Sequence, residues 1–336
     1  MISGDMVSFA PCAESDEGDD CVSNSAVLRV LPIPLATVLL VAGENTVFAC
    51  SICRCGDPTF NALGADAYSA GGFRAALDWE RFDKEQGAPG EERESLVENR
   101  FTALLSYGFS EGFTLVARVP FSHRDFSLGA PGQARDSLKT NGLSDPEIYA
   151  LVRLWSSSFA PGLGRRASLT AMAGLKMPWG RNHVDENGER VDEHAQAGTG
   201  STDGFAGLSG LYLFDKRSSL FSSVQYRRAG ENDFGYRYGR IFLGNLAYEH
   251  KLGDRLDGVV ELNYRHAGRD RLNAQRETDP STGGSVLYIT PRLLLNAGGG
   301  IVLRLVAQIP VVRDLNRVQE ERTVINAGVT FLLGSR

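Results

Sequence analysis

The sequence predicts an all-β protein, a single antiparallel, up-and-down transmembrane β-barrel of about twelve strands. Segments of roughly 9–11 residues carry apolar side chains at every second position, which is the length and period of a strand that crosses a bilayer. The stretches between these segments are alternately short and long from about residue 83 onward. A barrel of the bacterial outer membrane has tight periplasmic turns and long external loops, whereas a soluble β-sandwich has no such order.

The segment 255–266 illustrates the alternation. Leu262 and Tyr264 lie on one face of this predicted strand, while Glu261 and Asn263 lie on the other. Eleven further segments show the same period: 73–82, 98–109, 113–122, 144–155, 167–177, 203–214, 219–228, 238–250, 285–296, 300–310 and 322–333. Together they predict a barrel over 73–333. An even number of strands returns both ends of the barrel to the periplasmic side, as in bacterial outer-membrane barrels.

The connecting stretches predict which rim faces outward. We expect external loops at 83–97, 123–142, 178–202, 268–284 and 312–321, and periplasmic turns at 110–112, 215–218, 251–255 and 297–299. Aromatic girdles mark the two interfaces of such barrels, and six aromatic residues fall near predicted strand ends: Trp79, Phe109, Trp155, Trp179, Tyr212 and Phe214. Alternatively, Trp79 and Trp179 belong to a binding site for a ring-shaped solute.

The amino end carries an export signal behind an acidic extension. Residues 1–27 hold six acidic side chains and no Lys or Arg, although the leading part of a signal is normally basic. Our hypothesis is that this extension is an artefact of start-site choice; a genuine extension is the alternative. Residues 28–49 read as a signal peptide, with an apolar stretch too short to span a membrane and cleavage after Ala49. The net charge of −6 belongs to the extension, since acids and bases balance in the remainder.

A cysteine cluster follows the predicted cleavage site. Cys50, Cys53 and Cys55 lie in a segment, 50–72, that we expect to be a periplasmic piece or a short plug of the barrel. Three interpretations stay open. Two of the thiols form a disulfide in the oxidising periplasm, the three bind a soft metal such as Cu(I) or Zn(II), or Cys50 is lipidated. Beyond this possible metal, the sequence predicts no cofactor.

The face opposite the apolar one lines the lumen. It carries basic residues at Arg74, Arg100, Arg118, Arg153, Lys176, Arg227, Arg265, Arg292 and Arg304, and acidic ones at Asp78, Glu80, Glu147, Glu249 and Glu261. One hypothesis is that the surplus of positive charge biases the lumen toward anions, with Arg118, Arg265 and Arg304 central to it. The other is that the charges form a ladder of ion pairs that seals the lumen, because buried charges must pair or meet water.

Three stretches resemble a known family over roughly 70–333. They are 140–146 (Thr-Asn-Gly-Leu-Ser-Asp-Pro), 174–180 (Gly-Leu-Lys-Met-Pro-Trp-Gly) and 198–203 (Gly-Thr-Gly-Ser-Thr-Asp). They are similar to motifs of the outer-membrane β-barrel transporters of the phenol meta-pathway type, although Ser144 and Trp179 depart from the residues usual there. The resemblance implies a barrel that passes small organic solutes. From the residues themselves, Asp145 and Asp203 are expected to hydrogen-bond backbone amides where a loop re-enters a strand.

The expected function is therefore that of an outer-membrane channel or transporter for small organic solutes, aromatic or anionic ones among them. The alternative is a barrel that scaffolds or sheathes a metal-bearing or electron-transfer partner in the periplasm through its cysteine segment. We expect no enzymatic activity, because no nucleophile elbow is present, and no nucleic-acid partner, because no basic patch of that kind is present. The expected surroundings are the lipid of the bacterial outer membrane.

Overall fold

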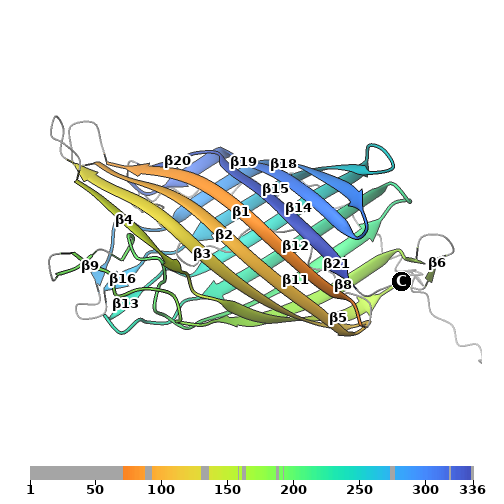
Figure 1. The fold of residues 1–336 in the computed structure, drawn as a ribbon, viewed down its shortest axis with the longest axis horizontal. Helices are drawn as coiled ribbons and strands as arrows, with labels where there is room; N and C mark the ends of the chain where they lie inside the picture. Colours follow the sequence, from red (N-terminus) through yellow and green to blue (C-terminus); the bar gives the residue numbers. More distant parts are fainter. Residues whose placement is uncertain are drawn as a thin grey trace, which may run out of the picture. The chain divides into compact units, whose positions relative to one another are not determined.

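A computed structural model describes residues 71–87, 93–129, 136–157, 159–160, 164–186, 189–191, 193–272, 277–317 and 319–333. The predicted extension, the signal peptide and the cysteine segment up to residue 70 lie outside these residues. The prediction of a twelve-stranded antiparallel barrel is confirmed (Figure 1). In the part of the chain that the structure describes, no helix is long and apolar enough to cross a membrane.

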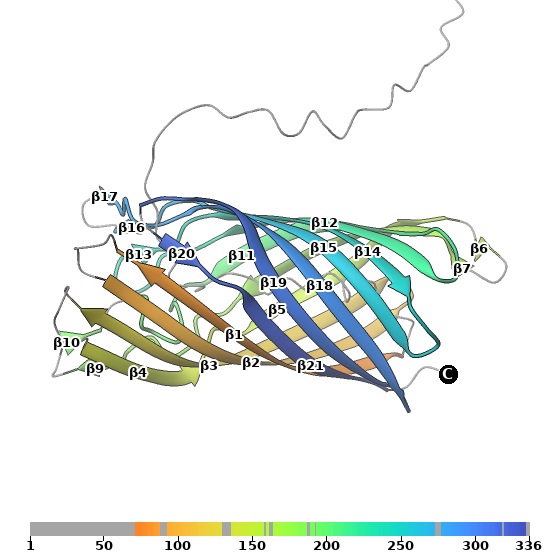
Figure 2. The ribbon, with the colours of Figure 1, turned by 90° about the horizontal axis from the view of Figure 1, so that it is seen from above.

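The wall consists of twelve strands in chain order. They are β1 (Phe73–Gln86), β2 (Arg93–Ser110), β3 (Phe113–Gly129), β4 (Asp136–Leu143) continued by β5 (Glu147–Ser156), β8 (Ala167–Lys176), β11 (Asp203–Leu213), β12 (Ser218–Arg228), β14 (Ile241–Lys251), β15 (Leu256–Ala267), β18 (Gly284–Gly298), β19 (Ile301–Leu315) and β21 (Val324–Leu333). Each strand pairs with its neighbour, and β1 pairs with β21, from Phe73 opposite Leu333 to Arg81 opposite Ile325. Figure 2 shows the strands tilted around the closed barrel.

Short strands of two or three residues lie at the two rims of the barrel. At the external rim they are β9 (Asp185–Glu186), β10 (Glu189–Arg190), β13 (Tyr236–Arg237), β16 (Arg271–Leu272), β17 (Glu277–Thr278) and β20 (Gln319–Glu321), and at the other rim β6 (Phe159–Ala160) and β7 (Gly164–Arg165). β1 begins and β21 ends at the rim of β6, where Phe73 stands opposite Leu333, and this rim is opposite that of β9 and β13 (Figure 1). Because bacterial barrels keep their ends in the periplasm, this arrangement agrees with the orientation expected from loop lengths.

Parts of several predicted external loops form paired β-strands instead. The loop predicted over 123–142 is a hairpin, in which β3 continues to Gly129 and pairs with β4. Likewise β1 extends to Gln86, β2 begins at Arg93, and β19 runs to Leu315. The physical reason is that the outward face needs apolar side chains only within the bilayer. Above it, strands still pair but the outward face is no longer required to be apolar, so the regular alternation that reveals them in the sequence disappears.

The predicted alternation of faces is confirmed within the bilayer. Leu262 is 44% exposed and Tyr264 39%, whereas Glu261 and Asn263 are fully buried in the interior. Near the periplasmic rim, four of the six predicted girdle residues are exposed, Phe109, Trp155, Tyr212 and Phe214. Trp79 differs, because it lies in the middle of β1 opposite Phe101, and Trp179 lies in the loop after β8.

The turn between β11 and β12 shows how short periplasmic connections are held. The Asp215 carboxylate accepts hydrogen bonds from the backbone N–H groups of Arg217 and Ser218, at 2.7 and 2.8 Å. The hydrogen bond from Arg217 is the main cause that lowers the pKa of Asp215 from its ordinary value. The carboxylate therefore stays ionised as the acceptor that closes the turn.

The orientation predicts a labelling pattern on whole cells. In a background with the natural cysteines replaced by serine, Lys139→Cys on β4 should react with a membrane-impermeant maleimide, because its side chain is 67% exposed at the external rim. Asp254→Cys, in the turn after β14, should react only after the outer membrane is broken. Early labelling at position 254 with protection at 139 would reverse the orientation.

The alternation predicts a depth-dependent cost of charge. Leu262→Arg should destabilise the barrel by about 2–4 kcal/mol, because it places a cation on the lipid face near the bilayer midplane. The matched control is Leu252→Arg in the exposed periplasmic turn directly after β14, which should cost about 0–1 kcal/mol because it lies near the interface. Urea unfolding in lipid vesicles measures both values. Equal costs at the two positions would contradict the assignment of faces.

Candidate functional site

The loop between β8 and β11 turns into the barrel. Its residues 194–199 are buried, and β3 and β4 hold it in place. Nη1 of Arg124 on β3 donates to the carbonyl oxygens of His194, at 3.2 Å, and Gln196. Thr140 Oγ1 on β4 donates to the Ala195 carbonyl at 2.6 Å. The loop is thus attached to the inner surface of the wall, which narrows the lumen at this level.

Asp145 holds both ends of the inward loop. It lies at the break between β4 and β5, just before Pro146, which has no N–H to donate to a neighbouring strand. Its Oδ1 accepts the N–H of Gly180 at 2.9 Å, and its Oδ2 accepts the N–H of Thr199 at 2.7 Å. The expectation that Asp145 hydrogen-bonds backbone amides is therefore confirmed. One carboxylate closes the loop on itself.

Two glycines allow this closure. The backbones of Gly180 and Gly198 approach so closely that a Cβ on Gly198 would lie 2.5 Å from the Cα of Gly180. A Cβ on Gly180 would in turn lie 2.6 Å from Asp145 Oδ1. Any larger residue would separate the two ends of the loop or displace the carboxylate, so both positions require glycine.

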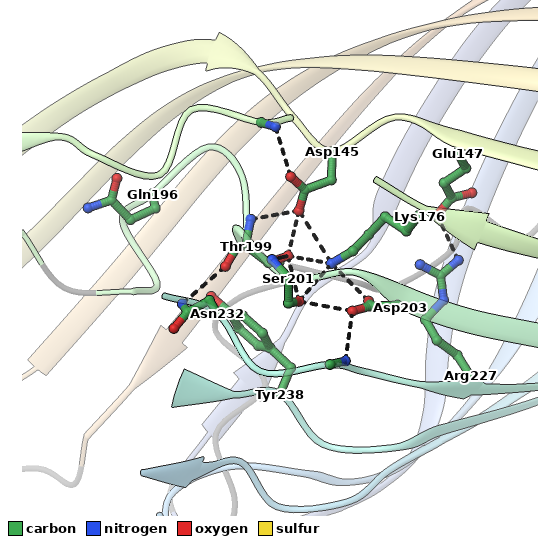
Figure 3. A network of polar contacts seen from close by, with 12 residues as sticks. Asp145, Glu147, Lys176, Gln196, Thr199, Ser201, Asp203, Arg227, Asn232 and Tyr238 are labelled. Carbon is green, nitrogen blue, oxygen red and sulfur yellow. Dashed lines mark hydrogen bonds and ion pairs between the residues drawn. The ribbon is translucent and has the colours of Figure 1, made fainter. Parts of the chain in front are cut away.

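Lys176 lies between two buried carboxylates (Figure 3). Its Nζ is 2.8 Å from Asp203 Oδ2 and 3.3 Å from Asp145 Oδ2. It also donates to the hydroxyls of Thr199 and Ser201, and Ser201 Oγ donates to Asp203 Oδ1 at 2.9 Å. Asp203 Oδ1 also accepts the N–H of Gly230 at 3.2 Å, as expected for this residue. The single ammonium therefore joins the end of β8 to the break before β5 and the start of β11.

The same lysine belongs to a row of alternating charges. Across four adjacent strands, Arg118 stands opposite Glu147, Glu147 opposite Lys176, and Lys176 opposite Asp203. Glu147 pairs with Arg118 at 3.1 Å and also with Arg227 of β12 at 2.7 Å. Opposite charges directly across a strand pair stabilise a sheet. Here they also neutralise one another inside the barrel.

Further ion pairs occupy the rest of the interior. Arg304 pairs with Asp78, and Arg292 with Glu261. Two larger groups centre on carboxylates, Glu98 between Arg100 and Arg124, and Glu321 between Lys84 and Arg265. All of these side chains are at most 9% exposed. Charge pairing is therefore a property of the whole lumen.

The predicted lumen residues lie in the interior. Arg74, Arg100, Arg118, Glu261, Arg265 and Arg304 are all buried within the barrel. The surplus of positive charge is smaller than expected among the described residues, since ten buried basic side chains stand against nine buried acidic ones, counting Asp270 of the β15–β18 loop. The sequence analysis overestimated the surplus because it left four acidic residues off the inner face, Glu98, Asp145, Asp203 and Glu321, but only two basic ones, Lys84 and Arg124. The predicted metal ligands Cys50, Cys53 and Cys55 lie outside the described residues.

Sequence reasoning also missed that the three motifs meet. Asp145, Lys176 and Thr199 come from 140–146, 174–180 and 198–203, and they form one hydrogen-bonded network. The available signal was their position, because each motif ends or begins a strand at the same rim and these strands follow one another in the chain.

Comparison with known proteins places the chain in a family. The family described as "Putative MetA-pathway of phenol degradation" matches residues 69–306. The chain belongs to this family. The resemblance inferred from the three motifs is thereby confirmed, and the network of Lys176 is the structure that these motifs of the phenol-degradation family form here. No curated protein sequence matches the chain.

One solved structure supports the fold. An outer membrane channel from Pseudomonas putida F1 is similar with a TM-score of 0.62 at 10% sequence identity, covering 82% of this chain and 100% of that one. The translocator domain of the autotransporter NalP from Neisseria meningitidis has a TM-score of 0.45 at 12% identity, covering 80% of this chain and 90% of that one. The architecture is thus that of an outer-membrane β-barrel.

The Lys176 network predicts a stability defect with a defined repair. Lys176→Gln should destabilise the barrel by about 3–5 kcal/mol, because it leaves two buried carboxylates without their cation. Adding Asp203→Asn should recover part of this loss, since one of the unpaired charges is then removed. Urea unfolding in lipid vesicles measures each variant.

The control for this series is Lys216→Gln, an exposed lysine in the β11–β12 turn, which should change stability by less than about 0.5 kcal/mol. If Lys176→Gln were as mild as this control, or if Asp203→Asn deepened its defect, Lys176 would not be the cation that holds the network.

Proposed function

We propose that the protein is a channel of the outer membrane that passes small organic solutes, and that aromatic carboxylates are the class it favours. The proposal rests on a guanidinium that lies over one ring of an aromatic pair on the inner wall. The narrow bore of a twelve-stranded barrel supports small solutes, and the inward loop narrows it further. The proposal assigns no enzymatic reaction to the chain.

Arg227 supplies the charge of this inner-wall site. Its guanidinium pairs with Glu147 through Nη2, while its Nε and Nη1 atoms are buried without a hydrogen-bond partner among the described residues. Unmet N–H groups in a buried position are costly. A solute carboxylate that accepted from them would remove that cost, so these donors favour anionic solutes during passage.

The aromatic rings lie next to this guanidinium. Arg227 lies over the ring of Phe205, 4.7 Å from its centroid, and Phe205 meets Tyr149 edge-on with centroids 5.8 Å apart. Both rings flank Gly174, which stands opposite each of them in the sheet. A Cβ on Gly174 would lie 2.3 Å from the Tyr149 Cβ and 2.8 Å from a Phe205 ring carbon, so glycine makes room for the pair.

An aromatic acid matches both parts of the inner-wall site. Its carboxylate would accept hydrogen bonds from Arg227, and its ring would contact Phe205 and Tyr149 in the edge-on or offset manner that aromatic pairs prefer. The near balance of buried charge supports this localised preference over the general positive potential expected from the sequence. The family description, which concerns phenol degradation, is consistent with aromatic solutes.

Planar-bilayer conductance tests the proposal with solutes of equal charge. Benzoate should permeate better than cyclohexanecarboxylate, and Phe205→Leu should remove that advantage, which we expect to be roughly two- to tenfold. Arg227→Gln should reduce benzoate permeability relative to uncharged phenol. Arg81→Gln, an exposed arginine on the lipid side of β1, is the control and should change neither ratio.

The outcomes separate the parts of the proposal. Equal permeability of benzoate and cyclohexanecarboxylate would remove the aromatic preference but leave a channel. A folded barrel that conducts none of these solutes would overturn the channel itself. It would then favour the alternative in which the barrel sheathes a periplasmic partner through its cysteine segment.

A further inference from the structure

A second cationic site lies at the external rim, outside the lumen network. Two loops, one joining β12 to β14 and one joining β15 to β18, enclose a cavity of about 340 Å³. Its lining includes five arginines, Arg228, Arg237, Arg240, Arg269 and Arg271. Among the described residues that line it, none is acidic. The cavity is therefore strongly electropositive.

Two arginines of the cavity lie on the lipid side of the wall. Successive side chains of a strand alternate in direction, so Arg228 shares the outward face of β12 with Tyr226. Arg240 directly precedes β14, and its carbonyl accepts the N–H of Gly268 as a continuation of the pairing, which places its side chain on the same side as Phe242. All four side chains are exposed. Tyr226 and Phe242 stand opposite each other, and Tyr264 of β15 lies 6.4 Å from Phe242 between ring centroids. These three rings form an external aromatic belt.

The position of the arginines relative to this belt sets their depth. Aromatic belts lie at the boundary between hydrocarbon and headgroups. Arg228 is two residues beyond Tyr226, and Arg240 is two residues beyond Phe242 on the same side, a displacement of roughly 7 Å along the strand. The guanidinium groups are therefore at the height of the lipid headgroups, with exposed apolar side chains such as Val224 and Leu246 below them.

The charges of the cavity are largely uncompensated by the protein. Of the five arginines, only Arg237 forms an ion pair in the described part of the chain, with Glu231 at 3.4 Å. Nε of Arg269 is buried there and has no hydrogen-bond partner among the described residues. Guanidinium groups gathered in this way repel one another. A bound polyanion would relieve the repulsion and satisfy the buried donor.

We propose that this cavity binds a phosphate group of the phosphorylated glycolipid in the outer leaflet. Guanidinium groups bind phosphate oxygens in a bidentate manner, which makes clustered arginines a phosphate site. The outward-facing side chains of Arg228 and Arg240 and their headgroup depth favour a membrane lipid over a solute bound for the lumen. Its acyl chains would lie along the apolar surface below the belt, so one lipid molecule would contact both the arginines and this apolar surface.

Native mass spectrometry of the purified full-length barrel in detergent tests this, with diphosphorylated lipid A as the probe. Wild-type protein should bind it, and Arg228→Gln with Arg240→Gln should weaken binding about thirtyfold. The matched control is Arg81→Gln with Arg93→Gln, which removes two exposed outward-facing arginines of β1 and β2 at the same rim. This control should bind lipid A within about twofold of wild type.

Two further binding measurements use the wild-type protein only, so their results do not depend on whether the variants fold. Dephosphorylated lipid A should bind at least tenfold more weakly than the diphosphorylated form, and inorganic pyrophosphate at equal concentration should not displace the lipid. Equal binding with and without phosphates would show that only acyl contacts matter. Displacement by pyrophosphate would make this a site for a free anion. Equal losses of lipid A affinity in the two double variants would show that the lipid responds to overall positive charge and not to this cavity. Each of these three results overturns the proposal.

Discussion

Charges inside a closed barrel must be neutralised inside it. Every second side chain of the twelve strands points inward, and buried charges are costly unless paired and hydrogen-bonded. The sheet register meets this constraint, since Arg118, Glu147, Lys176 and Asp203 stand opposite one another on four adjacent strands.

Where a pair must cross an intervening strand, the sequence leaves room for it. Gly328 stands between Arg304 and Asp78 in the sheet. A Cβ at this position would lie 2.0 Å from the Asp78 carboxylate, so the two charged side chains meet over a glycine. The size of the residue at position 328 is thus limited by the ion pair between the two neighbouring strands.

The inward loop depends on the same pairing. Asp145 accepts from both ends of the loop and is itself neutralised by Lys176. Loss of the lysine charge therefore acts on the wall and on the loop together, because a single carboxylate belongs to both. This coupling makes the loop a part of the barrel's electrostatics and not a freely attached cover.

The spanning strands could be predicted from the sequence, but the ion pairs between side chains of different strands could not. The bilayer imposes alternation on residues such as Leu262 and Asn263, so the twelve spanning segments were predictable. Above the bilayer the signal ends, since His123, Arg124 and Asp125 are all polar although only Arg124 points inward. The pairing of Lys176 with Asp145 and Asp203 needed the register between strands, which alternation within one strand does not determine.

Together, residues of the three family motifs hold the two ends of the inward loop between β8 and β11. Asp145, Gly180, Gly198 and Lys176 contact one another and the backbone, and these contacts use up their hydrogen-bonding capacity within the wall. Residues committed in this way are poorly suited to discriminate among solutes. Of the motif positions, Gly174 alone also serves the aromatic pair beside Arg227. Selectivity would then vary with Phe205, Tyr149 and Arg227, which lie outside the motifs, while the loop closure stayed the same.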